Sequence, residues 1–474
     1  MKRLKKLSKR PRTSGLLVAC LGAVVLLTTA SAASAVTYRP TRTDDPRPDG
    51  CKAKDCSLRE AVIASNAGSV PATILLRPGK RYVLTRQGAG MDADRGDLNI
   101  TSSGPLTVKT EGGGKSNQAT IDANRIDRIF DGSLTLNAVT LRDGLVGGDS
   151  VGGAIRGGIL DIRNSRLVNN TANGHGMFPA NGGAIFVNSG GELRMAGTRL
   201  KGNKAGAGGG GAIFISEGAS ASIFKSTLAR NGSGGFGAGL AIDAGGRAEV
   251  NRSTISGNKM NGAGDFSSGG GIGLYAPPGG PTATLEVENS TVANNSAGLD
   301  GGGIGSQDSH GSGSHATVEL DHVTVARNQA FTGQDVENGT HGGSGGGIFA
   351  TGDDSVSIHN TVVALNTVAT SRTRSIPSDC SLGWARPAPF VSLGHNLIGN
   401  PDSSCTGFGA TDLFGGKLKL GKLADNGGPT KTIALLKGSR AIGRAEPDAV
   451  RVDQRGVKRG NKPDIGAYER RAKK

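Results

Sequence analysis

The sequence predicts an all-β fold, a right-handed parallel β-helix (solenoid) with a short N-terminal capping helix and a C-terminal capping region. Glycine supplies 80 of the 474 residues, while aromatic residues make up only 4%, too few to fill a thick globular core. A Gly-X-Y period, which would indicate collagen, is missing from the sequence. Short β-branched runs recur between glycine clusters, a pattern typical of many short strands joined by tight turns.

A two-block repeat carries this prediction. The first block reads Gly-Gly-Ala-Ile at 182–185, and copies of it lie at 152–155, 210–213, 237–240, 269–272, 301–304 and 345–348. The second block alternates apolar and polar residues and ends at an asparagine. These asparagines recur every 27 to 38 residues, as Asn170, Asn203, Asn231, Asn258, Asn295, Asn328 and Asn366.

Each repeat therefore predicts one coil of two or three short strands, stacked on the next at about 4.8 Å. Isoleucines of the first block would face the core, and the asparagines would bond to one another along one corner. Helical and leucine-rich repeats are excluded because each of their units needs a helical stretch. A β-propeller is the alternative architecture, although its blades are usually longer.

The order of segments predicts five parts. These are a signal peptide at 1–35, a linker at 36–50, an N-terminal cap with the first coils at 51–130, β-helix repeats at 131–370 and a C-terminal cap at 371–474. Ser57 and Glu60 have the spacing of a capping box. A short helix beginning there would place Leu58, Val62 and Ile63 on one face, as a lid that covers the first coil.

The first 35 residues indicate export. Seven basic residues precede an apolar run, and Ala33-Ser34-Ala35 forms an A-x-A cleavage site. Lipid attachment at Cys20 and a retained membrane anchor are the alternatives. Cleavage after Ala35 predicts a secreted, extracellular protein without a membrane segment. The chain ends without a sorting motif or apolar tail, so we expect release rather than anchoring.

The net charge of the mature chain indicates which class of ligand it can bind. The leader carries seven of the 55 basic residues and no acid, so the mature chain keeps a net charge of +9. That charge favours polysaccharide or an anionic cell-wall polymer. The basic residues are scattered and form no nucleic-acid-binding motif, so nucleic acid is not expected. We expect a monomer.

Four cysteines remain in the mature chain, and they allow three possible disulfide connectivities. Pairing Cys51 with Cys56 and Cys380 with Cys405 closes the two shorter loops.

Several motifs resemble a known group of exported proteins. Residues 56–61 read Cys-Ser-Leu-Arg-Glu-Ala, followed by Gly-Asp-Leu at 96–98. The segments at 425–430, 438–442, 453–456 and 464–469 read DNGGPT, GSRAI, DQRG and DIGAYE. These are similar to bacterial CSLREA proteins with a choice-of-anchor Q ending. The resemblance implies a secreted β-helix, and it supplies no catalytic residues.

Strand alternation predicts a ligand-binding surface on the outside of the coils. One outward row would stack Phe186 on Phe214, beside a row of polar side chains that suits a sugar chain. The alternative is that the two rings only stack on each other under a loop. The predicted binding residues are Phe186, Phe214, Asn188, Ser216, Asp243, Tyr275 and Gln307.

Catalysis and metal binding are less well supported by the pattern. A lyase or hydrolase needs an acid and a base, and the outward row offers one acid, Asp243. Loop candidates for catalysis are Asp308, His310, His315 and Asp353, with Asp300, Asp335, His341 and Asp354 nearby in the sequence.

A second outward row would stack carboxylates, which repel unless a cation such as Ca²⁺ or a base such as Arg252 intervenes. The candidate metal residues are Glu286, Glu288, Glu319 and Asp321, beside Glu249. A solvated acidic ridge is the alternative. The sequence thus predicts a non-catalytic, adhesin-like scaffold that binds extracellular or cell-wall polysaccharide. A pectate-lyase-like lyase or a glycoside hydrolase is the alternative function.

Overall fold

The computed structural model describes residues 35–471, except 89–92, 115, 149, 175–179, 261–266, 278, 308–314, 332–342, 352, 372, 384–388 and 449. The predicted signal peptide lies outside the described residues, apart from Ala35, and it stays a prediction. Ala35–Lys474 form one compact unit. The described part of this unit contains one helix and many short strands.

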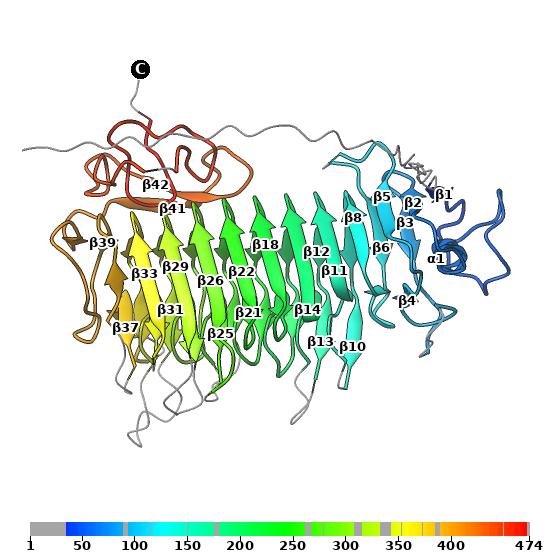
Figure 1. Ribbon diagram of the computed structural model, residues 1–474, viewed down its shortest axis with the longest axis horizontal. Helices are drawn as coiled ribbons and strands as arrows, with labels where there is room; N and C mark the ends of the chain where they lie inside the picture. The colour runs from blue at the N-terminus through cyan, green and yellow to red at the C-terminus, as the bar shows by residue number, and fades with distance from the viewer. Residues whose placement is uncertain are drawn as a thin grey trace, which may run out of the picture. The chain divides into compact units, whose positions relative to one another are not determined.

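Parallel strands stacked coil upon coil build the molecule, which confirms the predicted right-handed parallel β-helix (Figure 1). Its long sheet contains 20 strands. They are β1 (Val36–Tyr38), β2 (Ala72–Leu76), β4 (Leu98–Asn99), β5 (Leu106–Thr110), β7 (Phe130–Asp131), β8 (Leu134–Asn137), β11 (Ile155–Arg163), β14 (Ile185–Ala196), β17 (Ile213–Ile215), β18 (Ser220–Phe224), β21 (Leu240–Ile242), β22 (Arg247–Asn251), β25 (Ile272–Tyr275), β26 (Ala283–Glu288), β28 (Ile304–Gln307), β29 (Ala316–Asp321), β32 (Ile348–Ala350), β33 (Ser355–His359), β37 (Cys380–Leu382) and β38 (Val391–Ser392).

A second sheet of 12 strands forms another wall of the coils. Its strands are β3 (Arg81–Val83), β6 (Ala119–Asp122), β9 (Val139–Arg142), β12 (Arg166–Val168), β15 (Arg199–Lys201), β19 (Thr227–Ala229), β23 (Thr254–Ser256), β27 (Thr291–Ala293), β30 (Thr324–Ala326), β34 (Val362–Ala364), β39 (Leu397–Ile398) and β40 (Leu413–Phe414).

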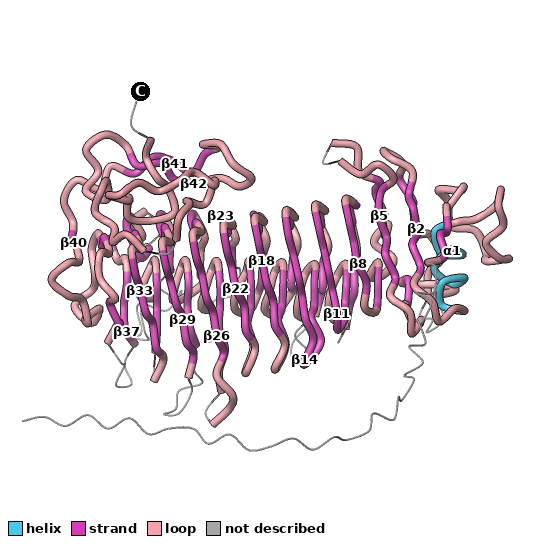
Figure 2. Tube along the Cα trace, turned by 45° about the horizontal axis from the view of Figure 1, so that its top comes forward, coloured by secondary structure: helices cyan, strands magenta, loops and turns pink. Residues whose placement is uncertain are grey.

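Shorter strands complete the coils. One sheet contains β10 (Leu145–Gly147), β13 (Thr171–Asn173), β16 (Lys204–Ala205), β20 (Gly232–Ser233) and β24 (Lys259–Met260). Another contains β31 (Gln329–Phe331), β35 (Thr367–Ala369) and β36 (Ser375–Pro377). β41 (Leu420–Ala424) and β42 (Thr432–Leu435) form a separate two-stranded sheet, a hairpin. Figure 2 shows the strands of successive coils side by side.

The glycine-isoleucine blocks stack in register, as predicted. Ile185 pairs with Ile213, which pairs with Leu240, and the series continues through Ile272, Ile304 and Ile348. All six side chains are at most 1% exposed. Glycine opens each block for a steric reason, which Gly210 illustrates. Gly210 has a φ of +68°, and a Cβ there would lie 2.4 Å from the carbonyl oxygen of Ile213.

The predicted asparagine ladder runs through the buried corner of seven coils. Each Nδ2 donates to Oδ1 of the asparagine in the next coil at 2.9 or 3.0 Å, from Asn170 to Asn366. The last asparagine, Asn366, donates to Oδ1 of Asp379 at 2.8 Å. Each side chain also satisfies backbone groups: Asn258 accepts from the Asn231 backbone N–H and donates to the Leu228 carbonyl. The ladder therefore supplies the buried polar groups of one coil with partners from its neighbours.

The N-terminal cap is built around α1 (Leu58–Asn66), which lies beyond β2 at the same end of the stack as β1 (Figure 1). The capping box of Ser57 and Glu60 is present, and Cys51 is disulfide-bonded to Cys56, both as predicted. The sequence reasoning missed Arg59, which is fully buried. Its guanidinium makes a bidentate pair with Asp45 at 2.7 and 3.0 Å and donates to the Gly96 carbonyl.

The structure adds detail at both of the expected domain ends. Segment 36–50, expected as a linker, contains β1, which pairs with β2, and Asp45, which anchors Arg59. The segment after Cys380, expected to close the far end, first adds another coil from β37 to β40, which contains the predicted disulfide from Cys380 to Cys405. The chain from 415 onward then packs along the side of the stack (Figure 1).

Small outward side chains make this side packing possible. Ala293, Ala326 and Ala364, on the outer face of the second sheet, are buried against Leu420, Ile433 and other apolar residues of the C-terminal region. Polar contacts also fix the position of the C-terminal region along the coils. Gln454, fully buried, donates to the Ser253 carbonyl at 3.0 Å and accepts from the Thr291 hydroxyl at 2.6 Å.

Replacing Asn258 by alanine removes one rung of the ladder. We expect Asn258→Ala to lower the free energy of unfolding by about 2–4 kcal/mol, because several buried polar groups lose their partners together. Urea-induced unfolding followed by circular dichroism measures the change. Asn173→Ala, at an exposed asparagine of β13, is the matched control and should change stability little. Equal losses for both variants would contradict a stabilising ladder.

Replacing Arg59 tests the buried pair in the cap. Arg59→Met leaves the Asp45 carboxylate buried without a charge partner, which should cost about 3–5 kcal/mol. The exposed pair of Arg163 with Asp161 provides the control, and Arg163→Met should cost less than about 1 kcal/mol. Thermal unfolding of both variants tests this difference, and an unchanged melting temperature for Arg59→Met would refute it.

Candidate functional site

The predicted aromatic row lies on the outside of the long sheet. Phe186 pairs in register with Phe214, and their rings stack with centroids 5.4 Å apart and planes inclined by 7°. Phe236, from the loop before β21, makes an edge contact with Phe214, with ring centroids 5.9 Å apart, and approaches Tyr275 at 6.0 Å. Phe214 is only 3% exposed. Its ring therefore has almost no surface left for a ligand, whereas Phe186 is half-buried.

The polar row beside it is also in the expected place. Asn188, Ser216 and Asp243 directly follow residues that pair in register, and Tyr275 pairs with Gln307 through the backbone. Ser216 is buried, and Asn188 and Asp243 are half-buried. Burial raises the pKa of Asp243 above its ordinary value. The side chain of Gln307 lies outside the described residues.

The loop candidates for catalysis are only partly described. Asp308, His310, Asp335 and His341 lie outside the described residues. His315 and Asp353 are exposed, and the His315 Nδ1 lies 3.4 Å from the Asp353 backbone carbonyl. Asp354 is buried and accepts hydrogen bonds from the backbone N–H groups of Ala316 and Thr351, which gives it a structural role.

Asp300 lies elsewhere in these loops. Its carboxylate accepts a hydrogen bond from the backbone N–H of Ser344 at 2.6 Å. The residue as a whole is half-buried, and burial of its carboxyl group raises the pKa to about 7.

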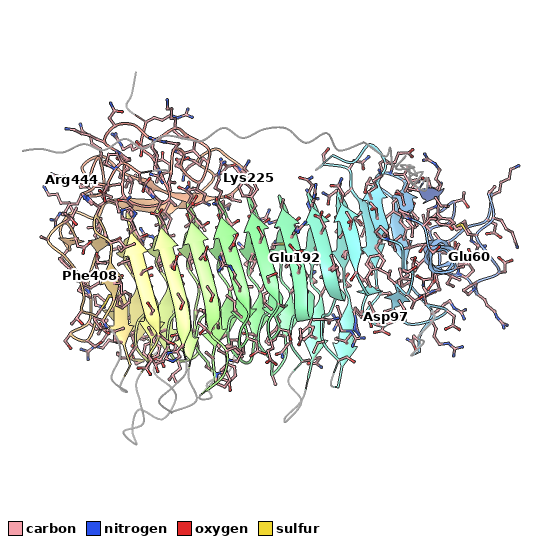
Figure 3. All side chains as sticks on the ribbon, in the orientation of Figure 1. Glu60, Asp97, Glu192, Lys225, Phe408 and Arg444 are labelled. Atoms are coloured by element: carbon pink, nitrogen blue, oxygen red, sulfur yellow. A yellow bond between two sulfur atoms is a disulfide. The ribbon has the colours of Figure 1, made fainter. Side chains whose placement is uncertain are left out.

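The predicted acidic row lines a groove of about 370 Å³ on the same face of the long sheet. Glu249, Glu286 and Glu319 stack in register, one coil apart. Arg247 neutralises the first two, because its Nη2 lies 3.1 Å from Glu249 and 2.5 Å from Glu286. The base expected here was Arg252, which instead donates to the Gln454 carbonyl. Figure 3 labels Glu192 on this polar face.

The other two predicted metal residues lie in the adjacent row. Glu288 accepts from the amide groups of Asn251 and Asn289, at 2.9 and 3.1 Å, so two hydrogen bonds stabilise this carboxylate. Glu288 pairs in register with Asp321, and Asp321 pairs with His359. The four predicted carboxylates therefore share one groove, but only Asp321 has histidine neighbours.

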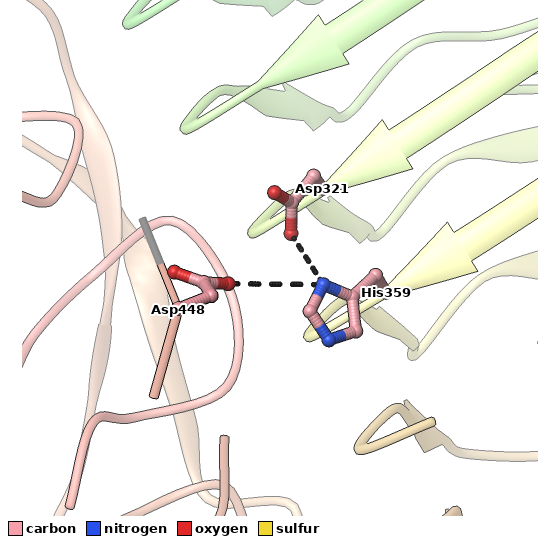
Figure 4. Close-up of side chains that lie close together, drawn as sticks. All are labelled: Asp321, His359 and Asp448. Carbon is pink, nitrogen blue, oxygen red and sulfur yellow. Dashed lines mark hydrogen bonds and ion pairs between the residues drawn. The ribbon is translucent and has the colours of Figure 1, made fainter. Parts of the chain in front are cut away.

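Asp321 belongs to a cluster of imidazoles and carboxylates at the end of this row. Its Oδ1 lies 2.9 Å from Nδ1 of His322 and 3.2 Å from Nδ1 of His359. Asp448, from the C-terminal region, approaches the same His359 nitrogen at 3.7 Å (Figure 4). The sequence reasoning missed His322, His359 and Asp448, because no motif or spacing joins position 448 to the two coils.

The cluster shifts the pKa values of Asp321 and His359. Burial disfavours the charged form of Asp321, but hydrogen bonds to His322 and His359 outweigh burial and hold its pKa well below the ordinary value. The hydrogen bond to Asp321 raises the pKa of His359, against the opposing effect of burial. The environment of the cluster therefore favours a negative Asp321 beside a positive His359.

A basic cleft lies between the second sheet and the C-terminal region. It encloses about 810 Å³, and six basic side chains and one acid line it. Arg199, Lys201 and Arg230 come from the coils, and Lys422 and Lys431 from the hairpin of β41 and β42 and its edge. Within the described part of the chain, none of these five cations has a carboxylate within 4.0 Å. The sixth, Arg327, donates to the Leu420 and Gly421 carbonyls.

The sequence reasoning described the basic residues as scattered and missed this cleft. A signal for part of it exists in the repeats. Outward positions of β15 are Arg199 and Lys201, whereas the matching positions of β27 are Thr291 and Ala293, which the C-terminal region buries. The change from basic to small side chains marks where the second sheet becomes covered. Nothing in the repeats indicates which segment covers it.

Truncating each of the two stacked rings tests how much that ring contributes to the stability of the fold. Phe214→Ala should lower the free energy of unfolding by about 3–5 kcal/mol, because the ring is enclosed by Phe186 and Phe236. Phe186→Ala should cost clearly less, since Phe186 is half-buried. Urea-induced unfolding of both variants measures the difference. A negligible loss for Phe214→Ala would contradict a packing role for this ring.

Comparisons with known proteins leave the assignment open. No protein-family model and no curated protein matches the chain, so the resemblance to CSLREA and choice-of-anchor Q proteins stays a prediction. Among solved structures, the chain is similar to the crystal structure of pectate lyase Pel9A, with 14% identity and a TM-score of 0.44. The match covers 92% of this chain and 98% of that one. Similarity at this level does not indicate a shared activity.

Proposed function

We propose that this protein is a secreted, non-catalytic β-helix scaffold that binds an acidic extracellular or cell-wall polysaccharide in the basic cleft. The observation that carries the proposal is the charge of the cleft, which has six basic side chains against the single carboxylate of Asp425. A concave, basic surface attracts polyanions and raises their local concentration.

The arrangement of the cations supports a polymer rather than a small anion. Arg199 and Lys201 lie in one coil and Arg230 in the next, so positive charges come from two neighbouring coils. Lys422 and Lys431 face them from the C-terminal region. Cations on two walls can contact a chain of sugar acids from both sides. Thr227 and Ser256 line the same cleft and offer hydroxyl groups as hydrogen-bonding partners.

Export is part of the same proposal. The A-x-A leader and the motifs similar to exported CSLREA proteins support it, and so do the two disulfides, which persist in oxidising compartments. None of the described helices has the length and apolar character needed to span a membrane. Expression of the full-length chain in a bacterial host, followed by N-terminal sequencing of the medium fraction, identifies the processed end.

Reversing charges in the cleft should weaken polyanion binding. We expect the double variant Arg199→Glu and Lys201→Glu to bind polygalacturonate about tenfold more weakly, because exposed ion pairs contribute about 0.2–1 kcal/mol each and two become repulsive. Isothermal titration calorimetry at fixed ionic strength measures the affinity. Binding by the unchanged protein should weaken as salt increases.

Lys54→Glu with Lys80→Glu is the matched control, since both lysines are exposed, far from the cleft in sequence, and carry the same charge change. Dextran, which is neutral, controls for non-ionic binding. If the control variant lost as much affinity for polygalacturonate, the change in net charge alone would explain the effect. Release of unsaturated or reducing products from polygalacturonate would overturn the non-catalytic part and favour a lyase or hydrolase.

A further inference from the structure

The cluster of Asp321, His359 and Asp448 joins three side chains from two distant parts of the chain. Asp321 and His359 stand in register at the ends of β29 and β33, while Asp448 belongs to the C-terminal region. One ligand atom of each, Oδ1, Nδ1 and Oδ2, lies within 4.8 Å of the others. Figure 4 shows both carboxylates directed at the same imidazole nitrogen.

The two carboxylates lack a permanent cation. Within the described residues, neither Asp321 nor Asp448 has a lysine or arginine within 4.0 Å, and their only ion-pair partners are His322 and His359. Asp448 additionally accepts hydrogen bonds from Asn360 and the Val450 backbone. Two negative groups that converge on one point repel each other unless a positive charge lies between them.

We propose that Asp321, His359 and Asp448 bind a divalent transition-metal cation, for which Zn²⁺ is the best fit. The His359 nitrogen lies 3.2 Å from the Asp321 oxygen and 3.7 Å from the Asp448 oxygen. Tetrahedral Zn²⁺ with bonds of about 2.0–2.1 Å places its ligand atoms about 3.3 Å apart. An imidazole ligand favours Zn²⁺ over Ca²⁺ or Mg²⁺, which prefer oxygen atoms alone.

The surroundings of the three ligands support a metal. When Nδ1 of His359 binds a cation, Nε2 carries the proton, and this nitrogen faces Oε2 of Glu446 at 3.4 Å. A carboxylate beyond a metal-bound histidine is the usual arrangement that fixes its tautomer. His322, fully buried, directs its Nδ1 to Asp321 at 2.9 Å and can hold that carboxylate in position.

A cation at this position would tie the C-terminal region to two coils. The metal would bind only the folded arrangement, because residues 321, 359 and 448 are remote in the unfolded chain. Binding should therefore stabilise the native state. The proposal does not depend on the basic cleft or on its ligand.

The test uses the mature protein, freed of metal with a chelator and then titrated with ZnCl₂. We expect saturable binding of one Zn²⁺ per chain in isothermal titration calorimetry, and a higher melting temperature with Zn²⁺ than without it. Asp448→Asn and His359→Gln should each weaken binding more than about 100-fold, since loss of even an outer partner weakens metal sites roughly 10–100-fold. Glu319→Gln, in the same groove, and His315→Gln, at an exposed histidine, should bind as the unchanged protein does.

Two measurements on the unchanged protein guard against variants that fail to fold. Co²⁺ loaded in place of Zn²⁺ should give visible absorption bands of a low-symmetry site. Anomalous diffraction at the zinc edge should place the ion between Asp321, His359 and Asp448. Absence of saturable binding by the unchanged protein, or equal binding by Asp448→Asn and His359→Gln, would overturn the proposal. Stabilisation by acid alone, without any response to Zn²⁺, would also overturn it and assign the cluster to protonated histidines.

Discussion

Stacking of one coil on the next in strict register is the constraint on which the rest of this structure depends. Every strand of the coils obtains its backbone partners from the neighbouring coils, so no coil is stable alone. The asparagine ladder fixes the same register with side chains, because an amide can accept from one coil and donate to the next. A slip of one residue would break the ladder and turn the inward isoleucines outward.

Because the core of each coil is thin, half of the side chains on every strand are free to vary. The long sheet uses this freedom for a stacked aromatic row and a row of carboxylates. The second sheet carries arginine and lysine on β15 and threonine and alanine on β27, β30 and their neighbours. The acidic row and the basic cleft thereby lie on different walls of the stack, and Arg247 accompanies the carboxylates of the long sheet.

The C-terminal region gives both candidate sites their final form. Its hairpin supplies one wall of the basic cleft, and the segment with Asp448 brings a second carboxylate to Asp321 and His359. Both sites lie where this region meets the coils. The region is held by burial of apolar side chains against Ala293, Ala326 and Ala364, and by the hydrogen bonds of Gln454. Packing that fixes this region therefore also positions the chemical groups.

The sequence by itself determined the features that depend on local order or on the repeat. The capping box of Ser57 and Glu60 spans one helical turn, the asparagines recur once per coil, and the paired cysteines are close in sequence. The acidic row followed from the same period. Tertiary structure alone decided the neighbours of Arg59, the enclosure of Phe214 and the meeting of His359 with Asp448. These contacts join segments whose separation follows no period, so they arise from the path of the chain outside the coils.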